Sequence, residues 1–194
     1  MHHLAIKAAA AALVVGAGTG AVTKSDNGTA TDIPHDALNP MVAGQAMLSG
    51  ASIYDNISRS PEHTAFVEVA MAAGVGNTLR NGGQYTVFAP TNAAYNALSR
   101  DAATDARHAA RYLVVRGQLD SQALLGMINA NGGEAKLKTL DGHTVTAMLN
   151  GPTNIALMDE RGRVADISIY DIHQRNGVLQ VIDAVLLPGK QARS

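Results

Sequence analysis

Two apolar segments, far apart in this 194-residue chain, most constrain how it can fold. Residues 85–98 contain a short apolar run that ends at a proline, and residues 176–188 contain a second run that follows Asn-Gly. Short apolar runs bounded by turn residues are typical of buried β-strands. The two strands are expected to bracket one domain, and Val87 and the inward side chains of residues 178–182 are expected to lie in its core.

The boundaries of both segments have structural explanations. Pro90 lacks the N–H group that a continuing strand needs, and Thr91 or Asn92 can cap a following helix. Asp183 likewise has a short polar side chain that can satisfy a backbone donor. We therefore expect Asn92 and Asp183 to stabilise the fold rather than to bind a ligand.

The rest of the chain favours helices first and strands last. Helical spacing of apolar residues predicts several helices within residues 53–131, with Ser60 and Ser121 as N-caps. Asp141-Gly142 and residues 159–162 are the turns of two predicted hairpins. This order predicts an α+β domain in which helices are segregated from a mostly antiparallel sheet.

The chain is expected to consist of an export signal, a linker and one domain. Residues 1–22 combine one lysine, an apolar run and a small-residue end, which is the pattern of a signal peptide cleaved near Ala21. An Ala-rich core helix and a retained N-terminal anchor are the alternatives. Residues 23–40 are polar and predict a flexible linker, residues 41–190 the domain, and residues 191–194 a C-terminal tail.

Composition excludes several classes of function. The formal net charge of −1 does not favour nucleic acid or an anionic membrane surface. The absence of cysteine excludes disulfides, thiolate nucleophiles and cysteine-based zinc sites. Aromatic residues make up 4% of the chain and tryptophan is absent, which argues against a stacking platform for sugars or bases.

No catalytic, metal or cofactor motif emerges from the residue pattern. The seven histidines do not form the spaced pair of a helical metal site with an acidic partner, and no Gly-x-Ser-x-Gly elbow occurs. The adjacent carboxylates Asp159 and Glu160 lie in a predicted hairpin turn. We therefore expect a protein that is not an enzyme and that has neither a cofactor nor a metal.

The two bracketing segments resemble the signatures of fasciclin (FAS1) domains. The first signature matches a run from Thr86 to Asn92, and the second a run that begins at Asn176. Where family members have Tyr-His between the signatures, this chain has Tyr112-Leu113, so the histidine is missing. The residues that carry the resemblance are Thr86, Val87, Phe88, Ala89, Pro90, Thr91, Asn92, Tyr112, Asn176, Gly177, Val178, Val181, Ile182 and Asp183.

The resemblance implies a fold and a general role. It implies a small secreted bacterial member with a single FAS1 domain, built as a mostly antiparallel, wedge-shaped sheet with helices packed against it. It also implies adhesion or contact with the extracellular matrix. Leu113 in place of the family histidine puts in doubt any function that depends on that histidine.

Two surface patches are candidates for partner binding. Arg107 and Arg111 are expected to share one face of a helix, where they could meet an anionic polysaccharide or an acidic protein, although a solvated face is the alternative. The pair Asp171-Ile172 precedes the second signature, and in animal relatives Asp-Ile pairs in comparable stretches are linked to integrin recognition. Only this dipeptide matches, so integrin binding is not carried over.

We expect a secreted or periplasmic, non-enzymatic protein that binds a protein or polysaccharide at the cell surface or in the matrix. Contact with a membrane is expected only through an uncleaved N-terminal segment, and no contact with nucleic acid is expected. The alternatives are a small-molecule-binding protein or unrecognised enzyme with a pocket at the helix–sheet junction, and a structural component of the envelope.

Overall fold

Both signature segments form strands, and they lie side by side. In the computed structural model, which describes residues 39–189, they are β3 (Tyr85–Pro90) and β9 (Gly177–Ile182). The expected signal segment, most of the expected linker and the expected tail lie outside the described residues. The other strands are β1 (Met41–Val42), β2 (Gln45–Ala46), β4 (Val114–Arg116), β5 (Glu134–Lys138), β6 (Thr144–Leu149), β7 (Ile155–Met158) and β8 (Val164–Gln174).

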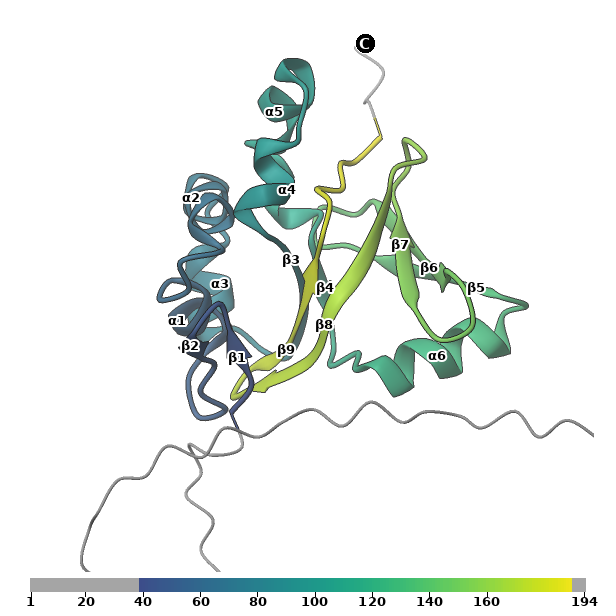
Figure 1. The fold of residues 1–194 in the computed structure, drawn as a ribbon, viewed down its shortest axis with the longest axis horizontal. Coiled ribbons are helices and arrows are strands. Elements are labelled where there is room, and N and C mark those ends of the chain that lie inside the picture. The colour runs from purple at the N-terminus through teal and green to yellow at the C-terminus, as the bar shows by residue number, and fades with distance from the viewer. Residues whose placement is uncertain (1–38, 190–194) are drawn as a thin grey trace, which may run out of the picture. The chain divides into compact units, whose positions relative to one another are not determined.

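The helices precede most of the strands in the chain, as the sequence predicts. Helices α1–α5 stand on the side of the sheet next to β3 and β9, and α6 lies beneath the end formed by β5–β8 (Figure 1). Their bounds are α1 (Ile53–Ile57), α2 (Thr64–Ala72), α3 (Gly76–Asn81), α4 (Asn92–Asn96), α5 (Arg100–Ala106), a 3-10 turn η2 (Ala109–Arg111) and α6 (Ser121–Ala130). Within residues 39–189 no helix has both the length and the apolar character to cross a membrane.

Side-chain caps fix several helix starts, but not always at the expected residue. Thr91 accepts a hydrogen bond from the N–H of Ala94 and caps α4. The cap of α6 is Asp120 rather than Ser121, because the Asp120 carboxylate accepts from the N–H of Ala123. The expected cap of α2, Ser60, lies before the helix and hydrogen-bonds His63 instead.

The expectation of a mostly antiparallel, wedge-shaped sheet is wrong, although the α+β class is right. The main sheet has seven strands in the order β4-β3-β9-β8-β7-β6-β5, and β3 pairs with β9 in parallel. A parallel pair needs a long crossover, and here residues 91–176, from α4 to β8, lie between the two strands. The register of β8 against β9 shifts twice, between Ile167 and Ile172. Such irregularities bend a strand, and they accompany the curvature of this sheet.

The two edge strands of the sheet nearly close it into a barrel. An antiparallel bridge pairs Val115 of β4 with Thr139 just after β5, and the N–H of Leu140 donates to the carbonyl of Val114 at 2.8 Å. Because only this bridge joins β4 to β5 within the described chain, the barrel has a seam on that side.

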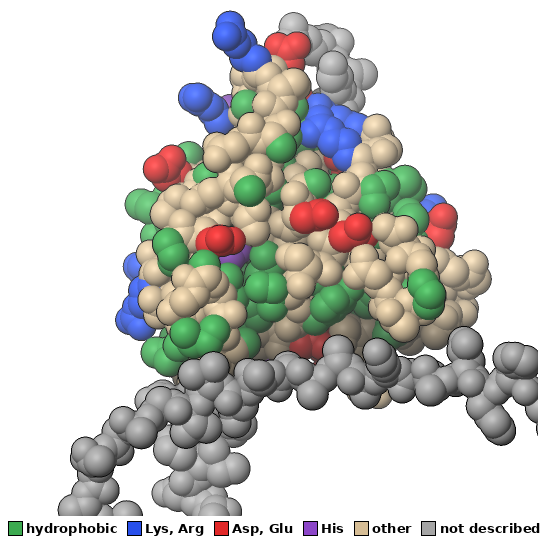
Figure 2. All heavy atoms as spheres, in the orientation of Figure 1, with side chains coloured by type: hydrophobic (Ala, Val, Ile, Leu, Met, Phe, Trp, Pro, Cys, Tyr) green, Lys and Arg blue, Asp and Glu red, His purple; other side chains and the backbone are tan. Residues whose placement is uncertain are grey.

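The core lies on both faces of the strands formed by the signature segments. All six residues of β3 and all six of β9 are buried, which explains their continuous apolar character. Val87 and residues 178–182 lie in the core as expected. The two buried polar side chains of these strands have hydrogen-bond partners. Thr86 donates to the carbonyl of Gly117, and Gln180 donates to the carbonyl of Leu119. On the face shown in Figure 2, acidic and basic side chains are interspersed with apolar patches, so that face has no single-sign surface.

Candidate functional site

Asn92 of the first signature holds α4 against the start of α2. Its side-chain carbonyl accepts hydrogen bonds from the N–H of Ala65 at 3.0 Å and the hydroxyl of Thr64 at 3.2 Å. Its amide donates to the carbonyl of Pro61 at 2.8 Å. Asp183 of the second signature accepts from the N–H of Asp166 at 2.8 Å. Both side chains are occupied by backbone groups, which leaves little capacity for a ligand.

Asn176 and Gly177 join the second signature to the helices. The Asn176 side chain accepts from the N–H of Ile53 at 2.8 Å and donates to the carbonyl of Leu79 at 2.7 Å, so it ties α1 to α3. Gly177 has a φ of +149° and lies directly against the carbonyl of Tyr85. The Asn-Gly pair therefore serves the packing of the helices on β3 and β9.

Tyr112 and Leu113, where the family histidine is missing, lie just before β4 and are both buried. The hydroxyl of Tyr112 donates to the carbonyl of Thr144 at 2.7 Å and accepts from the N–H of Glu160 at 3.3 Å. Burial is the largest of the effects that raise the pKa of Tyr112. Leu113 is 1% exposed and belongs to the main hydrophobic cluster. The leucine thus fills core volume at a position that no partner can reach.

Asp171 and Ile172, a candidate partner-binding pair, are engaged within the fold. Ile172 is 0% exposed, so it offers no surface to a partner. The Asp171 carboxylate accepts from the N–H and hydroxyl of Ser121 and from the side-chain amide of Gln180. Burial alone would raise the pKa of Asp171, but these hydrogen bonds outweigh it and hold the pKa below its usual value. The pair anchors β8 to the start of α6.

The expectation that Arg107 and Arg111 share one helix face is wrong. Helix α5 ends at Ala106, and Arg111 belongs to the separate turn η2. The backbone leaves the α-helical path at His108, which has a φ of −112° and ψ of 0°, so the four-residue spacing no longer aligns the two side chains. Both arginines are exposed, and Arg107 lies at the rim of a groove.

This groove, called the helical groove below, runs between α2 on one side and α4 and α5 on the other. Its volume is about 420 Å³, within the range of ligand sites. It is open to solvent and mostly apolar, with Glu68 and Arg107 as its charged residues. Its lining residues are Ala65, Glu68, Val69, Ala72, Tyr95, Leu98, Ala103, Ala106 and Arg107.

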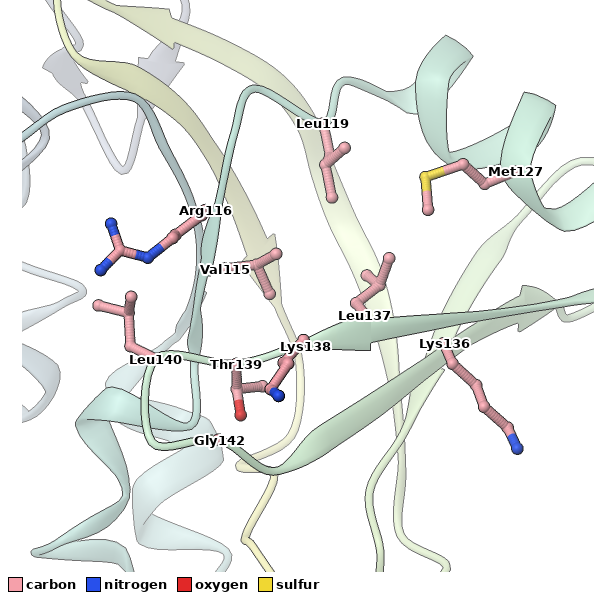
Figure 3. Close-up of a pocket in the computed structure, with 10 residues that line it drawn as sticks. All are labelled: Val115, Arg116, Leu119, Met127, Lys136, Leu137, Lys138, Thr139, Leu140 and Gly142. Atoms are coloured by element: carbon pink, nitrogen blue, oxygen red, sulfur yellow. The ribbon is translucent and has the colours of Figure 1, made fainter.

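A second groove lies at the seam of the barrel, where β4 and β5 diverge. This seam groove has a volume of about 470 Å³. Leu119, Met127 and Leu137 contribute apolar side chains from the loop before α6, from α6 and from β5, and the Lys136 side chain extends away from them (Figure 3). The full lining is Val115, Arg116, Leu119, Met127, Lys136, Leu137, Lys138, Thr139, Leu140 and Gly142.

Sequence reasoning missed the seam groove for a clear reason. The alternation of buried and exposed residues in β5 places Lys136 and Lys138 outward, and this local pattern is visible in the sequence. Their proximity to Arg116 depends on the meeting of β4 with the end of β5, which is not a local property. The helix–sheet junction, expected as a pocket in one alternative, is filled by buried side chains such as Ile53, Phe66 and Leu79.

The titratable groups within residues 39–189 form no metal cluster. Ser60 and His63 form a close polar pair, with Ser60 Oγ 2.9 Å from His63 Nδ1. They are 1% and 0% exposed, so a substrate cannot reach the hydroxyl. The other ring nitrogen, Nε2, has no hydrogen-bond partner among the described residues.

The buried His63 predicts a loss of stability in acid. Burial disfavours the imidazolium and lowers the pKa of His63 from 6.5 to about 4. Between these values the unfolded chain takes up a proton that the folded protein does not. The stability is therefore complete above the unfolded pKa and falls as the pH drops towards 4, by about 3 kcal/mol in total. Urea unfolding across this pH range should show the free energy of unfolding falling as the pH drops. His63→Gln should flatten this slope. The exposed His108→Gln should keep the slope, and equal slopes in the two variants would contradict the assignment.

The geometry defines an α+β domain with a nearly closed barrel, two structural signature segments and two open grooves. Residues 61–188 match the model of the fasciclin domain. The chain therefore belongs to the fasciclin domain family.

Several known proteins share this similarity over part of their length. Human periostin is 26% identical over 147 residues, which cover 72% of this chain and 16% of periostin. The cell surface glycolipoprotein MPB83 of Mycobacterium bovis is 30% identical over 111 residues, or 57% of this chain and 47% of MPB83. The chain thus spans less than half the length of either relative.

A solved structure confirms the fold. A FAS1 domain pair from the insect cell adhesion molecule fasciclin I superimposes with a TM-score of 0.60 and 12% sequence identity. The match covers 72% of this chain and 52% of that chain. At this identity the likeness concerns the fold alone.

Proposed function

We propose that this protein is a non-enzymatic fasciclin-domain protein that is exported and binds another macromolecule, a protein or a polysaccharide, at the cell surface. Membership of the fasciclin family supports this proposal. So does the similarity to MPB83, which is named a cell surface glycolipoprotein. The observation that carries it is the helical groove, an open apolar surface with one acidic and one basic residue at its rim. Exposed apolar surface rimmed by polar groups is characteristic of interaction sites.

The helical groove can be tested by filling it without disturbing the core. Ala72 lines the groove and is exposed on α2, so an arginine there places a long charged side chain in the groove. We expect Ala72→Arg to weaken capture of the cell-surface partner by about tenfold or more, since truncated or blocked contacts at the centre of an interface carry most of its energy. The measurement is crosslinking of the mature protein on intact host cells, followed by quantification of the captured partner.

Ala93→Arg is the matched control, because Ala93 is exposed on α4 and does not line the helical groove. It should leave capture unchanged. If both variants captured the partner equally well, the helical groove would not be the binding surface. Export is tested separately: N-terminal sequencing of the protein from its host should find a new terminus near Ala21.

A small-molecule ligand in the same groove is the second candidate. Tyr95 lines the groove, and its hydroxyl is buried without a hydrogen-bond partner within residues 39–189. Burial raises the pKa of Tyr95, so the hydroxyl stays protonated, and it can donate to a ligand where a shift of the groove side chains uncovers it. A ligand-induced rise in Tm that Tyr95→Phe abolishes would favour this function over macromolecular binding.

A further inference from the structure

We propose that the seam groove binds an extended acidic segment of a partner protein, which pairs as an additional strand with the free edge of β5. This inference does not depend on the helical groove, because the two grooves share no lining residue. It rests on three features of the seam groove: an unpaired strand edge, the direction of the backbone groups on that edge, and an excess of positive charge.

The edge of β5 lacks a second neighbour in the described part of the chain. β5 is the last strand in the sheet and pairs along its length with β6. On its other side, β4 reaches it only through the bridge between Val115 and Thr139, beyond which the two strands diverge (Figure 3). An unpaired edge offers a row of backbone donors and acceptors that an extended peptide can satisfy.

The pairing with β6 determines which backbone groups face the groove. The N–H of Thr139 donates to the carbonyl of His143 at 3.0 Å, so this pair is hydrogen-bonded. In an antiparallel ladder, hydrogen-bonded and non-bonded pairs alternate. Leu137 therefore bonds to β6, whereas the N–H and C=O groups of Lys136 and Lys138 point away from β6 and towards the seam groove.

The charges at the groove select an acidic partner. Arg116, Lys136 and Lys138 are exposed, and none of them has an ion-pair partner within residues 39–189. The nearby Asp141 is occupied, because its carboxylate accepts from the hydroxyl of Thr139 and the N–H of His143. Asp141 keeps its negative charge and Glu134 lies at the far end of β5, so the three cations and two acids leave an excess of one positive charge.

The two faces of the added strand would meet different surroundings. Lys136 and Lys138 lie on the outward face of β5, and Leu137 on the inward face. A peptide that alternates acidic and apolar residues would place its acids beside the lysines and its apolar residues beside Leu119 and Met127. An adjoining depression of about 470 Å³ continues along β5 to Asn131 and Glu134, which gives the groove the length that an extended peptide needs.

Lysines on an edge strand also discourage pairing with other strands. This protective effect acts through repulsion of basic strands and the cost of burying an unpaired ammonium group. An acidic strand removes both penalties. The protective and the binding interpretations therefore predict opposite responses to an acidic peptide, and binding measurements distinguish them.

The first test compares peptides of opposite charge and variants of the protein with reversed charges. The full chain is titrated with a fluorescent peptide of alternating glutamate and valine at low ionic strength, and binding is measured by fluorescence anisotropy. We expect saturable binding that a lysine–valine peptide does not show. The double variant Lys136→Glu/Lys138→Glu should weaken binding at least about tenfold, and added salt should weaken it further. Arg100→Glu/Arg111→Glu changes the net charge equally but lies away from the groove, so it should change binding by less than about twofold.

The second test addresses the backbone. Lys136→Gln removes the charge but keeps the N–H group, whereas Lys136→Pro removes both and leaves the bonds to β6 intact. We expect the proline variant to bind the acidic peptide at least about fivefold more weakly than the glutamine variant. Thermal unfolding curves should show that both variants are folded. In the parent chain, bound peptide should protect the amides of Lys136 and Lys138 from hydrogen exchange. Equal binding by the two variants, unprotected amides, or binding of phosphatidylglycerol vesicles or dextran sulfate in place of the peptide would overturn the proposal.

Discussion

Gly177→Ala is expected to lower the free energy of unfolding by about 4 kcal/mol, as for other changes that force a clash with the backbone at a strained position. A Cβ at this position would clash with the carbonyl oxygen of Tyr85, and the backbone has a φ of +149°, which residues with a side chain rarely adopt. Tyr85 and Gly177 form the first pair of the parallel β3–β9 ladder. Relief of the clash would therefore separate the two central strands at their start.

Gly126→Ala is the matched control for this prediction. Gly126 lies within α6, and a Cβ there would meet no atom within 4 Å. Because glycine weakens a helix, this change should raise the free energy of unfolding by about 0.5–1 kcal/mol. Urea denaturation of both variants gives the comparison. If Gly177→Ala unfolded at the same urea concentration as the parent chain, Gly177 would not approach the Tyr85 carbonyl closely in solution.

The elements that sequence reasoning predicted well are those fixed by neighbouring residues. The Asp141-Gly142 turn sets the hairpin of β5 and β6, since the turn residues and the flanking alternation act over a few positions. The apolar runs of β3 and β9 predicted two buried strands, because this pattern also depends only on neighbouring residues. Their parallel pairing was not foreseen, because neither run contains information on which strand lies beside it.

The failures have physical causes at particular residues. The full length of β8, which runs to Gln174, could not be read from the sequence, because register shifts interrupt the alternation that would identify so long a strand. Arg107 and Arg111 do not share a helix face, because α5 ends at Ala106 and the backbone leaves the α-helical path at His108. The roles of Asp171 and of the seam groove both depend on contacts between distant segments, so no local pattern could have indicated them.

Asp159→Ala is expected to cost about 4 kcal/mol, because one buried and two part-buried backbone donors would lose their acceptor at about 1–3 kcal/mol each. The side chain of Asp159 is 0% exposed. Its carboxylate accepts from the N–H of Arg161 at 2.8 Å, of Arg163 at 2.9 Å and of Leu187 at 2.9 Å. The first two bonds shape the turn between β7 and β8, and the third holds the segment after the second signature. This carboxylate therefore links the turn between β7 and β8 to the segment that follows β9.

Comparison with Asp159→Asn separates these contributions. Asparagine keeps one oxygen for the turn donors Arg161 and Arg163, but its amide would face the N–H of Leu187. We expect Asp159→Asn to lose about half of the free energy that Asp159→Ala loses, because one acceptor and the side-chain volume remain. The exposed Glu62→Ala should stay within about 0.5 kcal/mol of the parent chain. Chemical denaturation gives all three values. If Asp159→Asn were as stable as the parent chain, the bond to Leu187 would contribute nothing, and the carboxylate would act only within its own turn.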